Sequence, residues 1–147
     1  MKIEKIDHIC FAVEDLEKTK KIYKENLGLV PAVEYVAESE FIKVARYYIG
    51  DVAVELMEST TAEGEVAKFI KKRGEGVFLI SYKVEDLDGA LAELKAKGAD
   101  LIDKEPRALF GTRYAFIQKP NQLCGVLTEL IEGDFDITRV QEAGRKT

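Results

Sequence analysis

The chain has 147 residues, enough for one domain with a sizeable core or for two half-size modules that share one. Hydrophobic residues make up 46% and charged residues 33% of the sequence, which is typical of a globular protein with a well-charged surface. The formal net charge of -5 argues against general nucleic-acid binding. Since no signal peptide pattern and no apolar run of membrane-spanning length occurs, we expect a cytoplasmic protein that inserts into no membrane.

One strand-to-helix junction occurs twice in the chain. The segment VEDL at residues 13–16 returns unchanged at residues 84–87, and DVAVELME at 51–58 is echoed by GVLTELIE at 125–132. Such self-similarity indicates two copies of one structural unit that share a core.

Each copy is expected to fold as a strand, a helix and three further strands, because apolar positions alternate or recur at helical spacing in that order. In the first copy the expected elements are a strand at 3–13, a helix that Gly28 ends, and strands at 30–37, 40–49 and 51–58. In the second copy they are a strand at 77–85, a helix at 87–97, and strands at 100–104, 112–119 and 124–131. A short helix at 65–73 joins the copies, and residues 133–147 extend beyond them.

Two glutamates lie where strands do not favour them. Glu55 and Glu129 each interrupt an otherwise apolar strand face, at equivalent positions of the two copies. A buried carboxylate is costly unless it is paired or bound to a metal. His8, the single histidine, lies on an inward face of the first strand, and one imidazole with two carboxylates would suit a divalent ion. The alternatives are a satisfied core histidine and two solvent-facing glutamates.

The segments DHICFAVEDL (7–16), VAKFIKKRGEG (66–76) and GVLTELIE, in this order of elements, resemble the vicinal oxygen chelate superfamily of glyoxalases, bleomycin resistance proteins and dioxygenases. Within it the chain is most similar to the methylmalonyl-CoA epimerases. The resemblance covers about residues 4–132. It implies an α+β fold in which two tandem βαβββ modules, about 4–58 and 77–132, form one cupped mixed or antiparallel sheet around a metal.

The resemblance also implies four metal ligands, on the first and fourth strands of each module. Three of them match His8, Glu55 and Glu129. The fourth, a histidine in the family, matches Leu79, and the repeat offset between residues 13 and 84 leads from His8 to the same position. Leucine cannot bind a metal, so we expect weakened binding of a divalent ion such as zinc, cobalt, manganese or nickel.

Relatives are expected to use paired glutamates as acid and base on either side of the substrate α-carbon. One of them matches Glu129, but an ungapped comparison places Lys43 at the other. A lysine could transfer a proton if its pKa were lowered. We also expect that its ammonium approaches Glu55 and Glu129 and partly replaces the charge of the metal; the alternative is that Lys43 only reaches the surface.

Several further side chains are candidates for contacts with an anionic substrate. Lys72 and Arg73 belong to a basic run near the middle of the chain, which is alternatively a solvated helix face. Arg107 and Arg113 are cations of the second copy, and Tyr47 either lines the pocket or only packs. Cys10 shares the face of His8 and either lines the cup or is a small buried thiol.

Two functions follow as expectations. The first is an enzyme, of the isomerase or epimerase type or a lyase, that transfers a proton next to the carbonyl of a small acyl-CoA or similar substrate. The second is a metal-free protein that binds or sequesters a small molecule on the same scaffold. Because relatives often pair and half-sheets leave exposed edges, we also expect a homodimer.

Overall fold

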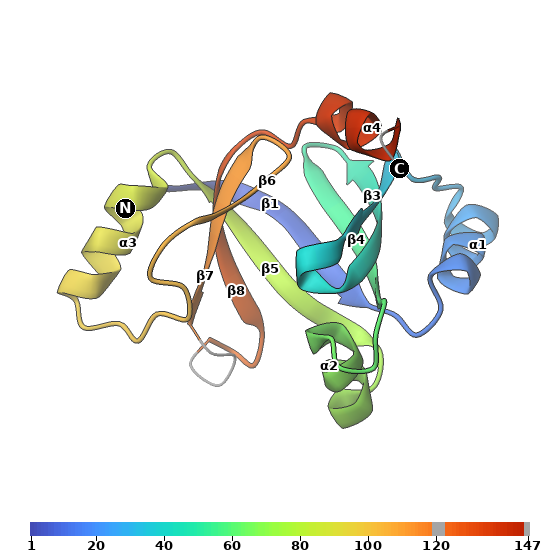
Figure 1. Cartoon of the computed structure of the whole chain (residues 1–147), viewed down its shortest axis with the longest axis horizontal. Helices are drawn as coiled ribbons and strands as arrows, with labels where there is room; N and C mark the ends of the chain where they lie inside the picture. The colour runs from blue at the N-terminus through green and yellow to red at the C-terminus, as the bar shows by residue number, and fades with distance from the viewer. Residues whose placement is uncertain (119–122, 146–147) are drawn as a thin grey trace. The chain divides into compact units, whose positions relative to one another are not determined.

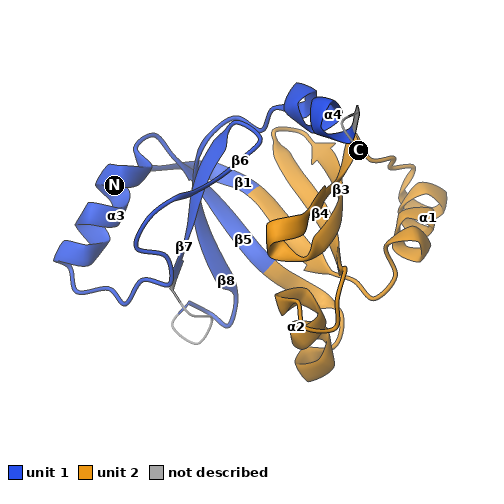
Figure 2. Cartoon of the chain, viewed as in Figure 1, with its two compact units in different colours: residues 1–7, 79–147 blue, residues 8–78 orange. Residues whose placement is uncertain are grey.

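The structure, a computed structural model, describes residues 1–118 and 123–145 (Figure 1). The chain divides into two compact units, shown in Figure 2. We call His8–Phe78 the N-terminal unit, and Met1–Asp7 together with Leu79–Thr147 the C-terminal unit. Each contains a helix and strands in the expected order, so the predicted α+β class with two βαβββ modules is confirmed.

The elements follow one another along the chain as β1 (Ile3–Ala12), α1 (Leu16–Leu27), β2 (Val33–Ala37), η1 (Glu38–Glu40), β3 (Ile42–Ile49), β4 (Val52–Ser59), α2 (Glu65–Arg73), β5 (Gly76–Val84), α3 (Leu87–Ala96), β6 (Arg107–Leu109), β7 (Thr112–Gln118), β8 (Leu127–Gly133) and α4 (Ile137–Arg145). Among the described residues, no helix combines the length and the apolar character that crossing a membrane requires.

In the N-terminal unit the strands lie in the order β2-β3-β4-β1, with β1 parallel to β4 and the other pairs antiparallel. Gly50, with φ of 63°, makes the tight turn that pairs Ile49 with Val52 and so sets the register of β3 on β4. The Asp15 side chain accepts a hydrogen bond from the Lys18 N–H and caps α1. Gly28, also left-handed, ends that helix as expected.

Helix α1 covers one face of this sheet. Leu16 and Tyr23 of the helix pack against Ala45, Tyr47 and Leu56 of β3 and β4. Burying a side chain as large as Leu56 contributes about 1.5–3 kcal/mol. Since side chains alternate along a strand, the opposite face of the same strands carries a different set of residues, which includes the polar site described below.

The C-terminal unit repeats this plan. Its strands lie in the order β5-β8-β7-β6, with β5 parallel to β8. The Asp86 side chain accepts a hydrogen bond from the Gly89 N–H and caps α3, as Asp15 caps α1. Leu87 and Leu91 of the helix join Leu130 of β8 in a buried core. The repeated VEDL junction therefore encodes the same helix start twice.

The second copy differs from expectation in its last strands. Residues 100–104 form no strand, and β6 instead follows Pro106, where it pairs with β7 through a tight turn at Phe110 and Gly111, both with positive φ. The Ile102 and Asp103 N–H groups still donate to carbonyls of β7. The expected strand at 124–131 begins only at Leu127, and residue 119, the expected end of its neighbour, lies outside the described residues. The C-terminal extension forms α4, in which Val140 is buried.

Candidate functional site

Glu55 lies at the centre of a buried polar cluster on the face of the N-terminal sheet opposite to α1. Its Cα is paired with Cys10 of β1 on one side and with Arg46 of β3 on the other. The Tyr35 hydroxyl of β2 donates a hydrogen bond of 2.6 Å to Oε2, and Arg46 Nη1 lies 3.2 Å from the same oxygen. The Glu55 carboxylate is 2% exposed, so its charge is balanced inside the protein by the guanidinium.

The other carboxylate oxygen, Oε1, faces β1. The Cys10 thiol donates a hydrogen bond to Oε1 at 3.6 Å, and His8 Nε2 lies 3.7 Å from Oε1. His8 and Cys10 are both buried and share a face because they are two residues apart on one strand, as the alternation predicts. The predicted candidates His8 and Glu55 are thus brought together.

The pKa values in this cluster favour fixed protonation states. Burial, followed by the Glu55 carboxylate, raises the pKa of Tyr35 well above its ordinary value, so the phenol remains a donor. Burial, the largest single influence, opposes the charge of Arg46, but the Glu55 carboxylate together with Tyr48 and Tyr35 outweighs it and raises the pKa of the guanidinium. Arg46 also donates to the Tyr48 hydroxyl and lies over its ring, 5.2 Å from the centroid. The cation is therefore held from two sides.

Glu129 occupies the equivalent position in the C-terminal unit. It pairs with Ser81 of β5 as Glu55 pairs with Cys10, and the Ser81 hydroxyl donates a hydrogen bond of 2.7 Å to its Oε1. Leu79 pairs with Leu127 as His8 pairs with Ala53, which confirms that Leu79 is the repeat counterpart of His8. On β7 the neighbour of Glu129 is Phe116, where β3 carries Arg46.

The donors of the N-terminal unit suit a metal ion. Nitrogen, sulfur and oxygen donors of His8, Cys10 and Glu55 all lie within 4.8 Å of one another, and all three residues are buried. An imidazole, a thiolate and a carboxylate are ligands that divalent zinc or cobalt accepts. Tyr35 and Arg46 contact Oε2, and His8 and Cys10 lie beside Oε1, so the chemistry of the residues present fits a divalent ion.

Lys43 is placed elsewhere than expected. Its Nζ lies 2.8 Å from Oε2 of Glu58, with which it is paired across β3 and β4, and this hydrogen bond raises the pKa of Lys43. The expectation that its ammonium approaches Glu55 is wrong, because Lys43 and Arg46 are three residues apart and point to opposite faces. Arg46 is the cation beside Glu55.

Tyr47 shares the face of Lys43 and packs in the core beneath α1. Its ring lies 5.2 Å from that of Tyr23, centroid to centroid, and the side chain is 1% exposed. Of the two alternatives for Tyr47, the structure supports packing.

The candidate anion-binding cations fall into two groups. Arg113 donates to both carboxylate oxygens of Asp88 at 2.9 Å and also contacts Glu132. Arg107 pairs with Asp103. Lys72 and Arg73 are exposed at the end of α2. Arg107 and Arg113 are thus engaged with carboxylates of the protein. Lys72 and Arg73 are exposed to solvent, and the Arg73 guanidinium lies over the Phe69 ring, 5.7 Å from its centroid.

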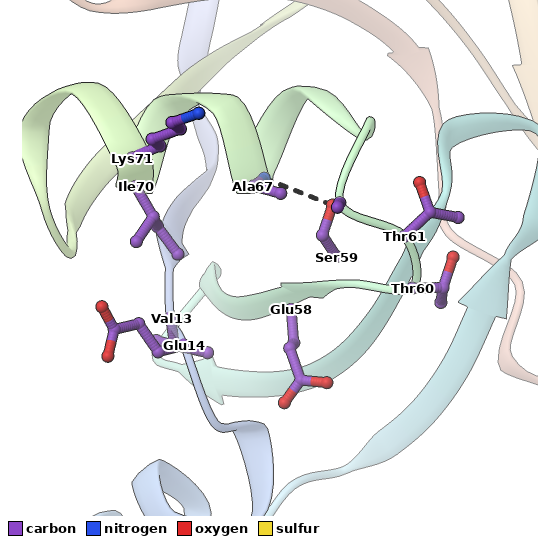
Figure 3. A pocket seen from close by; sticks show the side chains of 10 residues that line it. Val13, Glu14, Glu58, Ser59, Thr60, Thr61, Ala67, Ile70 and Lys71 are labelled. Carbon is purple, nitrogen blue, oxygen red and sulfur yellow. Dashed lines mark hydrogen bonds between the residues drawn. The ribbon is translucent and has the colours of Figure 1, made fainter.

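A pocket of about 450 Å³ opens between the end of β4, the following loop and α2 (Figure 3). Figure 3 shows Glu14 and Glu58 on one side and Lys71 on the helix above them. The Ser59 hydroxyl accepts a hydrogen bond from the Ala67 N–H and ties the helix to the strand. Two carboxylates against one ammonium disfavour phosphate groups, so this pocket does not suit the phosphates of a coenzyme.

Sequence reasoning missed Arg46, Tyr35 and Ser81. The hairpin at residues 50–51 contained the signal for Arg46. A two-residue turn pairs Ile49 with Val52, and three residues further from the turn on each strand Arg46 lies opposite Glu55. The repeat offset contained the signal for Ser81, since it leads from Cys10 to that position. Tyr35 could not be found in this way, because the β2–β3 connection gives no comparably fixed register.

Comparison with known proteins agrees with this fold. A family model described as the Glyoxalase/Bleomycin resistance protein/Dioxygenase superfamily matches residues 7–116. An uncharacterised protein of Bacillus subtilis, YqjC, is 34% identical over 131 residues, which cover 88% of this chain and 93% of that protein. The ethylmalonyl-CoA/methylmalonyl-CoA epimerase of Cereibacter sphaeroides is 26% identical, covering 87% of this chain and 97% of the epimerase. A variant of Streptomyces coelicolor methylmalonyl-CoA epimerase, solved with 2-nitronate-propionyl-CoA, shares 32% identity and a TM-score of 0.83, covering 90% of this chain and 96% of the other.

Proposed function

Because this chain belongs to the glyoxalase/bleomycin resistance protein/dioxygenase superfamily, we propose that it catalyses proton transfer at the carbon next to the carbonyl of a small acyl-CoA or a similar substrate. The observation that supports this most is the pair of repeat-equivalent buried carboxylates. Glu55 and Glu129 each accept a short hydrogen bond from a hydroxyl group, of Tyr35 and Ser81 respectively. The likeness to epimerases of CoA thioesters suggests the substrate class.

Glu129 is the proposed proton-transfer group. It is a buried carboxylate that the Ser81 hydroxyl holds in a fixed orientation, as a proton-transfer group requires, and its neighbour on β7 is Phe116. Its carboxylate would remove the α-proton and return a proton to the same carbon. Since Lys43 is engaged with Glu58, we assign no second proton-transfer group, and exchange of the α-proton is the reaction to measure rather than inversion.

A divalent ion would be held by His8 and Glu55, with Glu129 as the further ligand that the family resemblance implies. When bound, such an ion supplies positive charge for the oxygen of an enolate. Tyr35 and Arg46 orient Glu55 through Oε2, and Oε1, which faces His8 and Cys10, is the proposed ligand atom.

A second function, a metal-free binding protein, has an observation in its favour. Arg46 already supplies a buried positive charge beside Glu55, and Leu79 replaces the histidine of the family. An anionic group of a small molecule could then be bound without a metal. Retention of zinc, cobalt or manganese by the purified protein after dialysis separates the two functions, because only the first requires an ion.

For the substrate, Lys72 and Arg73 are the proposed contacts with coenzyme phosphates, since their exposed position on α2 leaves them accessible. Arg107 and Arg113 are less suited, as each would have to exchange a carboxylate of the protein for the ligand. The homodimer and the cytoplasmic location stay predictions from the sequence.

The test is incorporation of deuterium from D₂O at the α-carbon of methylmalonyl-CoA and propionyl-CoA, followed by mass spectrometry with zinc or cobalt present. We expect incorporation with the unaltered chain, its loss with Glu129→Gln and its retention with Lys43→Met. Exchange that survives Glu129→Gln would refute the role of Glu129. No exchange with either thioester would refute the enzymatic proposal and favour the binding protein.

A further inference from the structure

Cys10 is the residue of the polar cluster to which neither the family resemblance nor the proposed reaction gives a role. It is 0% exposed and paired with Glu55 across the parallel strands β1 and β4. Its sulfur lies 3.6 Å from Glu55 Oε1, and His8 Nε2 lies 3.7 Å from the same oxygen. One carboxylate oxygen thus faces a sulfur and a nitrogen donor at nearly equal distances.

These distances are close to those of ligands that share one ion. Zinc–ligand bonds of about 2.0–2.3 Å in tetrahedral geometry separate neighbouring donor atoms by roughly 3.3–3.6 Å. A separation of 3.7 Å is longer than a direct hydrogen bond between nitrogen and oxygen. The donors of His8, Cys10 and Glu55 all lie within 4.8 Å of one another, so small side-chain rotations would bring them onto one ion.

The charge of Arg46 also favours a metal site that includes Cys10. Because Arg46 already balances the Glu55 carboxylate, a dication held by His8 and Glu55 alone would bring two uncompensated positive charges into a buried site. A thiolate beside them supplies a further negative charge. Cys10 is the nearby donor that can provide it, by releasing its proton to solvent when the metal binds.

We propose that Cys10 is a metal ligand and that His8, Cys10 and Glu55 form a soft, zinc-class site in which the thiolate compensates for the histidine missing at Leu79. This inference deepens the metal-dependent form of the proposed function and rests on it for the substrate chemistry. Sulfur donors favour zinc and cobalt, whereas manganese and magnesium prefer oxygen. The site therefore discriminates against manganese, unlike one built from imidazole and carboxylates alone.

The chain offers a matched control for this proposal. It has two cysteines, and Cys124 is exposed and belongs to the C-terminal unit. In a Cys124→Ser background Cys10 is the only thiol, so any thiolate-to-metal signal must come from it. The readout is the electronic absorption of bound Co²⁺, in which thiolate coordination gives an intense near-ultraviolet charge-transfer band.

We expect the Cys124→Ser chain to develop this band on titration with Co²⁺ and to saturate at one ion per chain. Zn²⁺ should displace the Co²⁺, and Mn²⁺ should not. Cys10→Ser in the same background should lose the band and bind Zn²⁺ more weakly by at least roughly tenfold. Thermal unfolding in chelator checks that Cys10→Ser still folds.

Bound Co²⁺ without a thiolate band would overturn the proposal even if Cys10→Ser failed to fold, and so would the absence of Co²⁺ binding. An unchanged zinc affinity in a folded Cys10→Ser chain would also overturn the proposal. Deuterium exchange into acyl-CoA is measured separately on the same samples. A thiolate band without exchange would refute the proposed function alone, and exchange without a thiolate band would refute only the role of Cys10.

Discussion

Lys43 Nζ lies 2.8 Å from Oε2 of Glu58, whose Oε1 accepts a hydrogen bond from the first N–H of α1, at Leu16. The C-terminal unit repeats this arrangement. Glu132 accepts from the Leu87 N–H of α3, and Arg113 binds its other oxygen. A carboxylate at a helix N-terminus is stabilised by the unpaired N–H groups there, and the cation holds the carboxylate in place. Lys43 thus belongs to a structural motif that both units share.

This motif predicts that Lys43 has no part in catalysis. Lys43→Met should change metal affinity and deuterium exchange by no more than roughly twofold, as is usual for partly exposed positions. Glu58→Ala removes the acceptor of the Leu16 N–H and should lower the free energy of unfolding by about 1 kcal/mol, measured by urea denaturation. A loss of exchange in Lys43→Met with unchanged stability would contradict this assignment and restore the catalytic interpretation.

Arg113 makes stability depend on pH in a predictable direction. Its hydrogen bonds lower the pKa of Asp88 from the ordinary value of 3.8. A carboxyl whose pKa is lower in the folded state stabilises the fold above its unfolded value, and this contribution is lost as the pH falls through the folded value. Arg113→Gln should therefore destabilise the protein near neutral pH, and the difference from the unaltered chain should shrink below pH 3.8.

The matched control is Lys72→Gln, which removes one cation from the exposed end of α2. Urea denaturation of both variants, near neutral pH and below pH 3.8, separates the effect of the local ion pair on stability from the general effect of net charge. A destabilisation by Arg113→Gln that persists unchanged at acid pH would show that Asp88 is not the partner through which Arg113 acts.

Most of the fold could be predicted because the sequence contains the same structural unit twice. The repeated junction puts an aspartate, Asp15 or Asp86, at the same helix cap, and equivalent strand positions follow from it. The strand expected at 100–104 was wrong because a short apolar run next to Pro106 does not determine on which side of the proline pairing begins.

The site was predicted only in part, for a reason that lies in strand geometry. Alternation placed His8 and Glu55 on one face correctly. An ungapped comparison with relatives led to Lys43, although the cation beside Glu55 is Arg46. A displacement of three residues along a strand moves a side chain to the other face, so small alignment errors change the chemistry assigned to a site.

Arg46 itself provides a prediction that separates stability from metal binding. Arg46→Met removes the guanidinium and leaves the buried Glu55 carboxylate without its cation, which should cost about 3–5 kcal/mol in the metal-free protein. A bound divalent ion replaces the lost charge, so zinc should bind more tightly and restore much of the stability. Thermal unfolding in chelator and in zinc measures both effects.

Arg46→Lys is the comparison for this variant, because it keeps a positive charge but loses the planar guanidinium. It should be milder than Arg46→Met in chelator and gain less from zinc. Equal behaviour of the two variants in chelator and in zinc would indicate that packing of Arg46 against Tyr48 matters more than its charge.

Leu79 provides a test of the proposal that a histidine at its position would strengthen metal binding. Leu79→His places an imidazole at the repeat counterpart of His8, in a buried position of β5. Without metal, the buried polar ring should destabilise the protein by about 1–3 kcal/mol. With zinc the new ligand should raise the affinity for zinc by more than roughly tenfold and reverse the loss of stability.

Leu79→Asn, similarly polar but a poor zinc ligand, should be destabilised in chelator and remain so in zinc. If zinc binds Leu79→His no better than the unaltered chain, the missing histidine is not what limits the metal site.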